Sequence, residues 1–179
     1  MKLVIRKMSY PDIQEVQEIA QTSWHSTYEG IIPRDVQDRF LAQAYNPDML
    51  EKRYSGSPFY VAEQEGVIVG FANYSNIQTG QWVELAAIYL HPEYQKQGIG
   101  TALLQKGIED LKPAYVCINV EKDNTIGMNF YKAKGFKVVE EFEEDFDGHQ
   151  LQTVRMKLDV KEGETYEKSS VQQAPFSKN

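Results

Sequence analysis

The chain has 179 residues, enough for one ordinary domain with a sizeable core. Its net charge of -7 and pI of about 5.0 argue against bulk nucleic-acid binding, which needs a basic surface. A single cysteine, Cys117, excludes an intrachain disulfide and a cysteine-based zinc site, and no apolar run is long enough to span a membrane. We therefore expect a cytoplasmic domain over residues 1–160 and a polar, disordered tail over 161–179.

The first part of the chain predicts one strand followed by helices. A strand over 2–7 precedes a helix start at Ser9, which has Pro11 close behind it and an acid three residues after the cap. Apolar residues at helical spacing continue this first helix. Further helical stretches are expected within 35–44 and 48–54.

Three strands follow, and the last of them leads into a turn that contains two glycines. Strands over 59–64 and 67–76 flank a two-residue turn suited to a hairpin, and a third strand covers 82–90. The glycine-containing turn over 95–101 then opens a helix over 99–111. This order of strand, turn and helix points several backbone N–H groups toward one spot at the positive end of a helix, where a phosphate or pyrophosphate fits.

The remaining chain predicts one more strand, a helix and an antiparallel pair. A strand over 115–120 precedes a helix capped by Asn124, and strands over 137–142 and 151–158 are joined by an acidic linking segment over 143–148. The predicted fold class is therefore α/β of the α+β type. It consists of a mixed, mostly antiparallel sheet of six to seven strands flanked by helices.

Two common phosphate-binding motifs do not fit the turn. A Rossmann site needs Gly-x-Gly-x-x-Gly near the first strand, whereas this turn follows the fourth strand and contains only Gly98 and Gly100. A P-loop needs a lysine and then serine or threonine after its second glycine, but Thr101 and Ala102 occupy these positions. The two glycines lack a Cβ, so a ligand can still approach the main chain closely.

The wider context of the turn resembles the acyl-CoA motif of the GCN5-related N-acetyltransferases. Residues 88–100 read Ile-Tyr-Leu-His-Pro-Glu-Tyr-Gln-Lys-Gln-Gly-Ile-Gly and contain the family pattern Gln/Arg-x-x-Gly-x-Gly/Ala after a central strand. A second family motif consists of Asn124, Phe130-Tyr131 and Gly135-Phe136. The resemblance covers residues 3–158 and implies a fold whose central strand and the next strand splay apart.

The resemblance implies acetyl-CoA as the cofactor and a division of roles along its site. The main chain of the turn is expected to hold the pyrophosphate, and the edge of the central strand to pair with the pantetheine arm. Asn124 is expected to contact the pantetheine or its edge, and Tyr131 to reach the cofactor sulfur. The residues expected to bind the cofactor are Ile88, Tyr89, Leu90, Gln95, Lys96, Gln97, Gly98, Ile99, Gly100, Thr101, Ala102, Asn124 and Tyr131.

Acetyl transfer to an amine, whose pKa is near ~10, needs a base, a donor for the carbonyl oxygen and an acid for the thiolate. Glu84 is the predicted base, and strand alternation puts it nominally on one face with Ile88 and Leu90 unless a bulge shifts the phase. Tyr131 is the predicted acid and the Leu90 N–H the predicted oxyanion donor. The alternatives are a solvent-facing carboxylate for Glu84 and core packing for Tyr131. His25 is the alternative base, or else a wall or surface residue.

The acceptor pocket is expected between the first two helices and the final hairpin. Its candidate walls are Trp24, His25, Tyr28 and Phe146, because aromatic faces suit a cationic amine, and their alternative is simple core packing. An acidic run over 140–147 favours a polyamine, and its alternative is a solvated hairpin tip. A looser resemblance to bacterial spermidine/spermine N-acetyltransferases also points to a small polyamine-like acceptor.

Two other functions stay open at this point. Acetylation of a protein N-terminus, as in enzymes that modify ribosomal proteins, predicts a shallow, peptide-wide groove. A non-catalytic acyl-CoA-binding module is the second alternative, and the presence of both Glu84 and Tyr131 argues against it. No metal site is expected, because His91 and His149 form no cluster in the sequence. Exposed strand edges are compatible with a homodimer.

Overall fold

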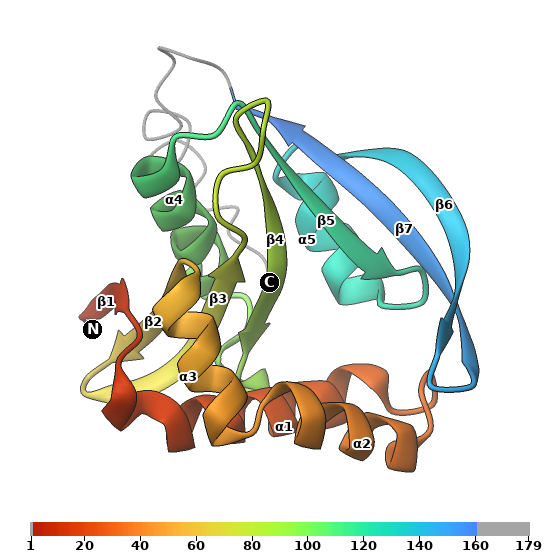
Figure 1. Cartoon of the computed structure of the whole chain (residues 1–179), viewed down its shortest axis with the longest axis horizontal. Helices are drawn as coiled ribbons and strands as arrows, with labels where there is room; N and C mark the ends of the chain where they lie inside the picture. The colour runs from red at the N-terminus through yellow and green to blue at the C-terminus, as the bar shows by residue number, and fades with distance from the viewer. Residues whose placement is uncertain (1, 161–179) are drawn as a thin grey trace.

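Seven strands form one mixed sheet in the computed structural model, which describes residues 2–160 (Figure 1). The strands lie in the order β1-β2-β3-β4-β5-β7-β6, and only the β4–β5 pair is parallel. Their bounds are β1 Leu3–Lys7, β2 Phe59–Gln64, β3 Val67–Tyr74, β4 Trp82–Leu90, β5 Tyr115–Glu121, β6 Lys137–Phe146 and β7 His149–Asp159. The predicted fold class is confirmed, while the tail expected over 161–179 lies outside the described residues.

Helices cover both faces of this sheet, and each face has its own apolar core. Their bounds are α1 Ile13–Tyr28, α2 Arg34–Ala44, α3 Pro47–Gly56, α4 Ile99–Leu111 and α5 Thr125–Ala133, with 3₁₀ turns at Tyr10–Asp12 and Pro92–Tyr94. Helices α4 and α5 pack on one face through a core that includes Leu104 and Phe130. Helices α1 and α3 pack on the opposite face through Val16 and Leu50, which are fully buried. The helical spacing of apolar residues predicts these packing faces.

Strand β4 contains a bulge that changes which face its side chains occupy. Tyr74 pairs with Leu85 and Asn73 with Ala87, so β4 has one more residue than β3 at this point. Before the bulge Leu85 belongs to the core under α4, whereas after it Ala87 belongs to the core under α1. Glu84 therefore lies on the α1 face, opposite the face that Leu90 occupies, and the nominal alternation is wrong here.

The acidic linking segment predicted over 143–148 is part of a long hairpin. Strand β6 continues to Phe146 and β7 begins at His149, so only Asp147 and Gly148 form the turn. Their φ angles of 51° and 82° are those of a two-residue turn in which both central residues are left-handed. Asp-Gly is the dipeptide that favours such a turn, and the sequence-based prediction overlooked this signal.

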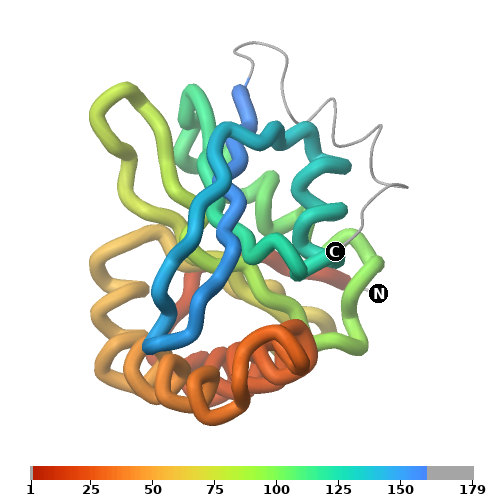
Figure 2. The backbone as a smooth tube through the Cα atoms, turned by 90° about the vertical axis from the view of Figure 1, so that its right-hand side faces the viewer, coloured from red at the N-terminus to blue at the C-terminus, as the bar shows by residue number. Residues whose placement is uncertain are grey.

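Strands β4 and β5 separate soon after they meet. Their parallel pairing joins 82–84 to 115–117 and goes no further (Figure 1). At the other end of this opening, the β6–β7 hairpin reaches α1 and α2, as Figure 2 shows with the hairpin in blue. Arg39 Nε lies 2.6 Å from Asp147 Oδ2, and His149 Nε2 lies 2.9 Å from the Ile31 carbonyl oxygen. The splay of the central strands is thus closed at one end by the hairpin tip.

A partly buried ion pair joins the start of the helical region to the sheet. Arg6 on β1 donates to both carboxylate oxygens of Asp12, at 2.8 and 2.9 Å, and lies 2.9 Å from Glu63 on β2. Burial by itself raises the pKa of Asp12, but hydrogen bonds from Arg6 and Ser9 outweigh it and hold that pKa below its usual range. The ionised carboxylate therefore stabilises the folded state.

We expect Asp12→Asn to lower the free energy of unfolding at pH 7 by about 2 kcal/mol, the order expected when a charged hydrogen-bond partner is lost. Because the folded pKa is depressed, this stability is present above the unfolded value of about 3.9 and is lost as pH falls through the folded pKa. Urea unfolding of wild type and Asp12→Asn at pH 7 and pH 3 measures this difference in the free energy of unfolding. An equal deficit of the variant at both pH values would contradict an effect of the charge.

Candidate active site

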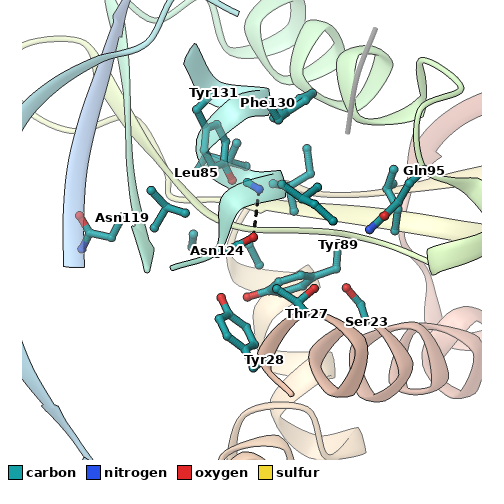
Figure 3. Close-up of a pocket in the computed structure, with 17 residues that line it drawn as sticks. Ser23, Thr27, Tyr28, Leu85, Tyr89, Gln95, Asn119, Asn124, Phe130 and Tyr131 are labelled. Carbon is teal, nitrogen blue, oxygen red and sulfur yellow. Dashed lines mark hydrogen bonds between the residues drawn. The ribbon is translucent and has the colours of Figure 1, made fainter. Parts of the chain in front are cut away.

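A pocket lies where β4 and β5 separate (Figure 3). Its walls come from α1, the second half of β4, the end of β5, helix α5 and Gln95 of the turn. Of the predicted site residues, those that line it are Tyr28, Ile88, Tyr89, Leu90, Gln95, Asn124 and Tyr131. The structure thus brings together the central strand, the first glutamine of the turn and the second family motif.

Three polar residues line the pocket that the sequence-based prediction did not name. Ser23 and Thr27 lie one helical turn apart on α1, and Asn119 lies on β5. Figure 3 shows Ser23 and Thr27 on the same side of α1 as Tyr28. The spacing of Ser23 and Thr27, four residues apart on either side of buried Trp24, is the sequence signal from which a pocket-facing surface of this helix could have been predicted.

The second half of β4 offers a free backbone edge. The pairing with β5 ends at Glu84, so the edge of residues 85–90 that faces β5 is outside the ladder. The same residues pair with β3 on their other edge as far as Leu90. A strand edge of this kind is what an extended chain of amides, such as the pantetheine arm, needs for strand-like pairing.

The turn before α4 has the geometry of an anion cradle. Gly98 is the N-cap of α4 with φ of 85°, and Lys96 is also left-handed with φ of 62°. As at the start of any α-helix, the backbone N–H groups of the first turn have no partners within the helix, and they can bind an anion. The Thr101 hydroxyl is buried and has no hydrogen-bond partner in the part of the chain that the structure describes. An orphaned buried donor beside a helix N-terminus fits the pyrophosphate of CoA.

Tyr131 stands in the pocket wall as a protonated phenol. Its ring packs at centroid distances of 5.4 Å from Phe130 and 5.3 Å from Phe136, and the residue is buried. Burial first, and then the neighbouring Tyr28, raise the pKa of Tyr131 well above its usual value. The hydroxyl therefore keeps its proton at neutral pH, which is the state that a general acid requires.

Tyr28 and Asn124 connect α1 to the start of α5. The Asn124 side chain caps α5 by accepting from the Gly127 N–H at 2.9 Å, drawn as a dashed line in Figure 3, and it also hydrogen-bonds Tyr28. Burial, opposed by this hydrogen bond and aided by the charge of Glu121, raises the pKa of Tyr28 to about 12. Both groups face the pocket.

Glu84, the predicted base, is bound by Arg155. Arg155 donates to both carboxylate oxygens, at 2.8 and 3.1 Å, and also to Asn119 Oδ1 at 2.9 Å. Glu84 does not line the pocket between β4 and β5. Both carboxylate oxygens thus already accept hydrogen bonds from a guanidinium. The ion pair therefore weighs against the predicted base role, which stays a prediction.

Two of the predicted aromatic walls, Trp24 and Phe146, belong to an aromatic cluster and do not line the pocket. Trp24 is buried and lies 4.5 Å from Phe40 and 6.0 Å from Phe146 between ring centroids. These contacts join α1, α2 and the hairpin, which is the core-packing alternative for Trp24 and Phe146. His25 lies 2.8 Å from Asp38 on α2 and does not line the pocket.

Residues 13–136 match the model of the Acetyltransferase (GNAT) family. The chain belongs to this family. A GNAT structure, that of the PaiA N-acetyltransferase from Thermoplasma acidophilum in complex with coenzyme A, superposes with a TM-score of 0.77 at 28% identity. The match covers 89% of this chain and all of that one. The chain is an acetyl-CoA-dependent N-acetyltransferase, as the two sequence motifs predict.

Two relatives with different acceptors are similar to this GNAT chain. The spermidine N(1)-acetyltransferase of T. acidophilum is 30% identical over 157 residues, which cover 83% of this chain and 93% of that protein. The N-alpha-acetyltransferase of Sulfurisphaera tokodaii is 34% identical over 105 residues, which cover 49% of this chain and 60% of that protein. Among residues 2–160, no group of three or more His, Cys, Asp or Glu is arranged to hold a metal ion, and no helix has the length and apolar character needed to cross a membrane.

Proposed function

We propose that this GNAT enzyme acetylates a small, polyamine-like primary amine. The observation that carries the proposal is the pairing of β6 with β7, which turns one half of the acidic run toward the α1 face of the sheet. Glu140 pairs with Arg155, and Glu144 pairs with Leu151 of the aromatic cluster, so both carboxylates lie on that face. Carboxylates beside aromatic rings suit a cationic, apolar-stemmed molecule. The spermidine N(1)-acetyltransferase of T. acidophilum supports the same class.

The other half of the acidic run faces away from this surface. Glu141 pairs with Val154 and Glu143 with Gln152, on the face that packs toward α5. Glu141 is held by Lys122 at 2.6 Å, and Glu143 accepts from Gln152 at 3.1 Å. All six acidic residues of the run are exposed, and its two faces serve as each other's control in mutagenesis.

In the proposed reaction the protein positions the reactants and handles one proton. Bound acetyl-CoA supplies the acetyl group. The free edge of β4 orients the cofactor arm, and the Leu90 N–H is the proposed donor to the carbonyl oxygen as negative charge develops. The acceptor reacts as the neutral amine, and its nitrogen forms a C–N bond to the acetyl carbon as the C–S bond breaks. The Tyr131 hydroxyl gives its proton to the departing thiolate, and the proton that the nitrogen loses returns to Tyr131 through solvent. Direct transfer between substrates held in line requires no covalent intermediate on the enzyme.

Steady-state CoA release with three acceptors tests the proposal. We expect spermidine to give a higher kcat/KM than an Nα-blocked lysine or an N-terminal peptide. A preference for the peptide would favour the rival, protein N-terminal acetylation. Tight binding of acetyl-CoA without turnover of any amine would indicate an acyl-CoA-binding module. The contacts of the hairpin tip with α1 and α2 argue against a peptide-wide groove. A cytoplasmic location and a homodimer stay predictions.

We expect Glu84→Gln to lower kcat by less than about tenfold and to keep the shape of the kcat–pH profile, because removal of a working general base costs about 100-fold or more. The ion pair with Arg155, which also contacts Asn119, supports a positioning role for Glu84. The measurement is kcat from pH 6 to 9 for the variant and the wild type. Loss of about 100-fold together with the acidic limb of the profile would restore Glu84 as the base.

A further inference from the structure

Glu121, the last residue of β5, carries a buried carboxylate with no cationic partner in the described chain. Only 7% of the residue is exposed, and its Oε2 accepts a hydrogen bond from the Asp123 N–H. No lysine, arginine or histidine between residues 2 and 160 forms an ion pair with it. The neighbouring cations are engaged elsewhere, Lys122 with Glu141 and Arg155 with Glu84.

The strand register fixes the face on which Glu121 lies. Glu121 pairs with Thr153 of β7, and Thr153 pairs with Phe142 of β6, so the three side chains share the α1 face of the sheet. The Thr153 hydroxyl donates to Glu144 Oε1 at 2.9 Å. Glu121 thus lies on the same face of the sheet as Glu140 and Glu144, the carboxylates proposed to attract a cationic acceptor. Unlike them, Glu121 is buried.

Glu121 also lies beside the pocket. Asn119, which shares a face of β5 with Glu121 because strand residues alternate, lines the pocket, and so does Asn124, three residues after Glu121. Tyr28, another lining residue, interacts electrostatically with Glu121 and with Tyr131. The end of β5 therefore holds the carboxylate next to the pocket that contains the proposed acid.

A buried charge without a counter-ion is unfavourable in the free protein. Titratable groups in unfavourable environments cluster at functional sites. Asn119 on β5 lines the same pocket as Tyr131, so a molecule whose reacting amine lies by Tyr131 can extend along the pocket toward the end of β5, where Glu121 lies. We propose that Glu121 binds the second, non-reacting ammonium group of a polyamine acceptor and so selects diamines and triamines over monoamines. This inference rests on the proposed function and names the residue that determines its specificity.

The test compares Glu121→Gln with wild type on spermidine and on n-butylamine, which lacks a second ammonium group. We expect kcat/KM for spermidine to fall roughly 10- to 100-fold, mainly through KM, as for a lost hydrogen bond between charged groups. For n-butylamine kcat/KM should stay within about twofold. Glu143→Gln is the matched control, because it removes the same charge from the opposite face and should leave both substrates unaffected.

A thermal-shift measurement supplies a second readout. The amide of Glu121→Gln still accepts from the Asp123 N–H while the unpaired charge is gone, so the Tm without ligand should equal or exceed that of wild type. Spermidine should raise the Tm of wild type but not of the variant. Three outcomes would each overturn the role of Glu121: an equal fall in kcat/KM for both amines, an unchanged kcat/KM for spermidine, or a lower Tm of ligand-free Glu121→Gln than of wild type. If wild type does not acetylate spermidine at all, the proposed function fails instead.

Discussion

Tyr131→Phe is expected to lower kcat about 100-fold while the KM for acetyl-CoA changes by less than about twofold. The substitution removes only the hydroxyl, and the ring keeps its edge contacts with Phe130 and Phe136. Burial keeps the phenol protonated, so its loss removes the proton that the thiolate receives. Steady-state kinetics with spermidine and acetyl-CoA measures both constants.

Tyr60→Phe is the matched control for this substitution. Tyr60 is buried in the same core but does not line the pocket, so loss of its hydroxyl should leave kcat within about twofold. An unchanged kcat in Tyr131→Phe would remove the tyrosine from the mechanism. A rise in the KM for acetyl-CoA with kcat intact would assign it to cofactor binding alone.

Thr101→Val is expected to raise the KM for acetyl-CoA by about tenfold or more, since a hydrogen bond to a charged group contributes about 1.5–3 kcal/mol. The hydroxyl is buried without a partner in the described protein, and the turn before it holds Gly98 in a left-handed conformation. Valine keeps the branched shape of threonine but cannot donate to a pyrophosphate oxygen. Steady-state kinetics with varied acetyl-CoA and isothermal titration with CoA both measure the loss.

The stability of the cofactor-free protein separates this effect from a packing defect. Removal of an unpartnered buried hydroxyl should leave the Tm of free Thr101→Val equal to or above that of wild type. Thr101→Ser keeps the donor and should keep the KM for acetyl-CoA close to that of wild type. A lower Tm in the valine variant, or the same rise in KM in both variants, would contradict a hydrogen bond to the cofactor.

The proposed cofactor and acceptor sites depend on different kinds of structure in this protein. The proposed cofactor contacts lie on the free edge of β4 and in one turn, over residues 85–101, which is continuous in sequence. The proposed acceptor surface is formed by α1, the end of β5 and the β6–β7 hairpin. These segments are distant in sequence and meet through Trp24, Phe146 and the hairpin tip. Variation in the hairpin can therefore change the acceptor without disturbing cofactor binding.

The predicted elements were most accurate where a local signal has one physical meaning. The helix over 99–111 and the strand over 82–90 agree with the structure in both bounds, because helical spacing and a proline after the strand define them. The hairpin over 137–159 was predicted too short, because its acidic residues were interpreted as a loop although Asp-Gly marks the turn. Charged residues are compatible with a strand that lies at the edge of a sheet, as β6 does.

The sequence by itself determined the family and the cofactor, because the motifs that identify them consist of a few consecutive residues; the position of the pyrophosphate in the turn stays a prediction. The tertiary structure alone decided the environment of each carboxylate. A bulge in β4 moved Glu84 to the α1 face, where Arg155, 71 residues away, binds it, whereas Glu121 is buried without a cation from residues 2–160. Ionic partners of this kind depend on strand register and long-range pairing, which local sequence patterns do not encode.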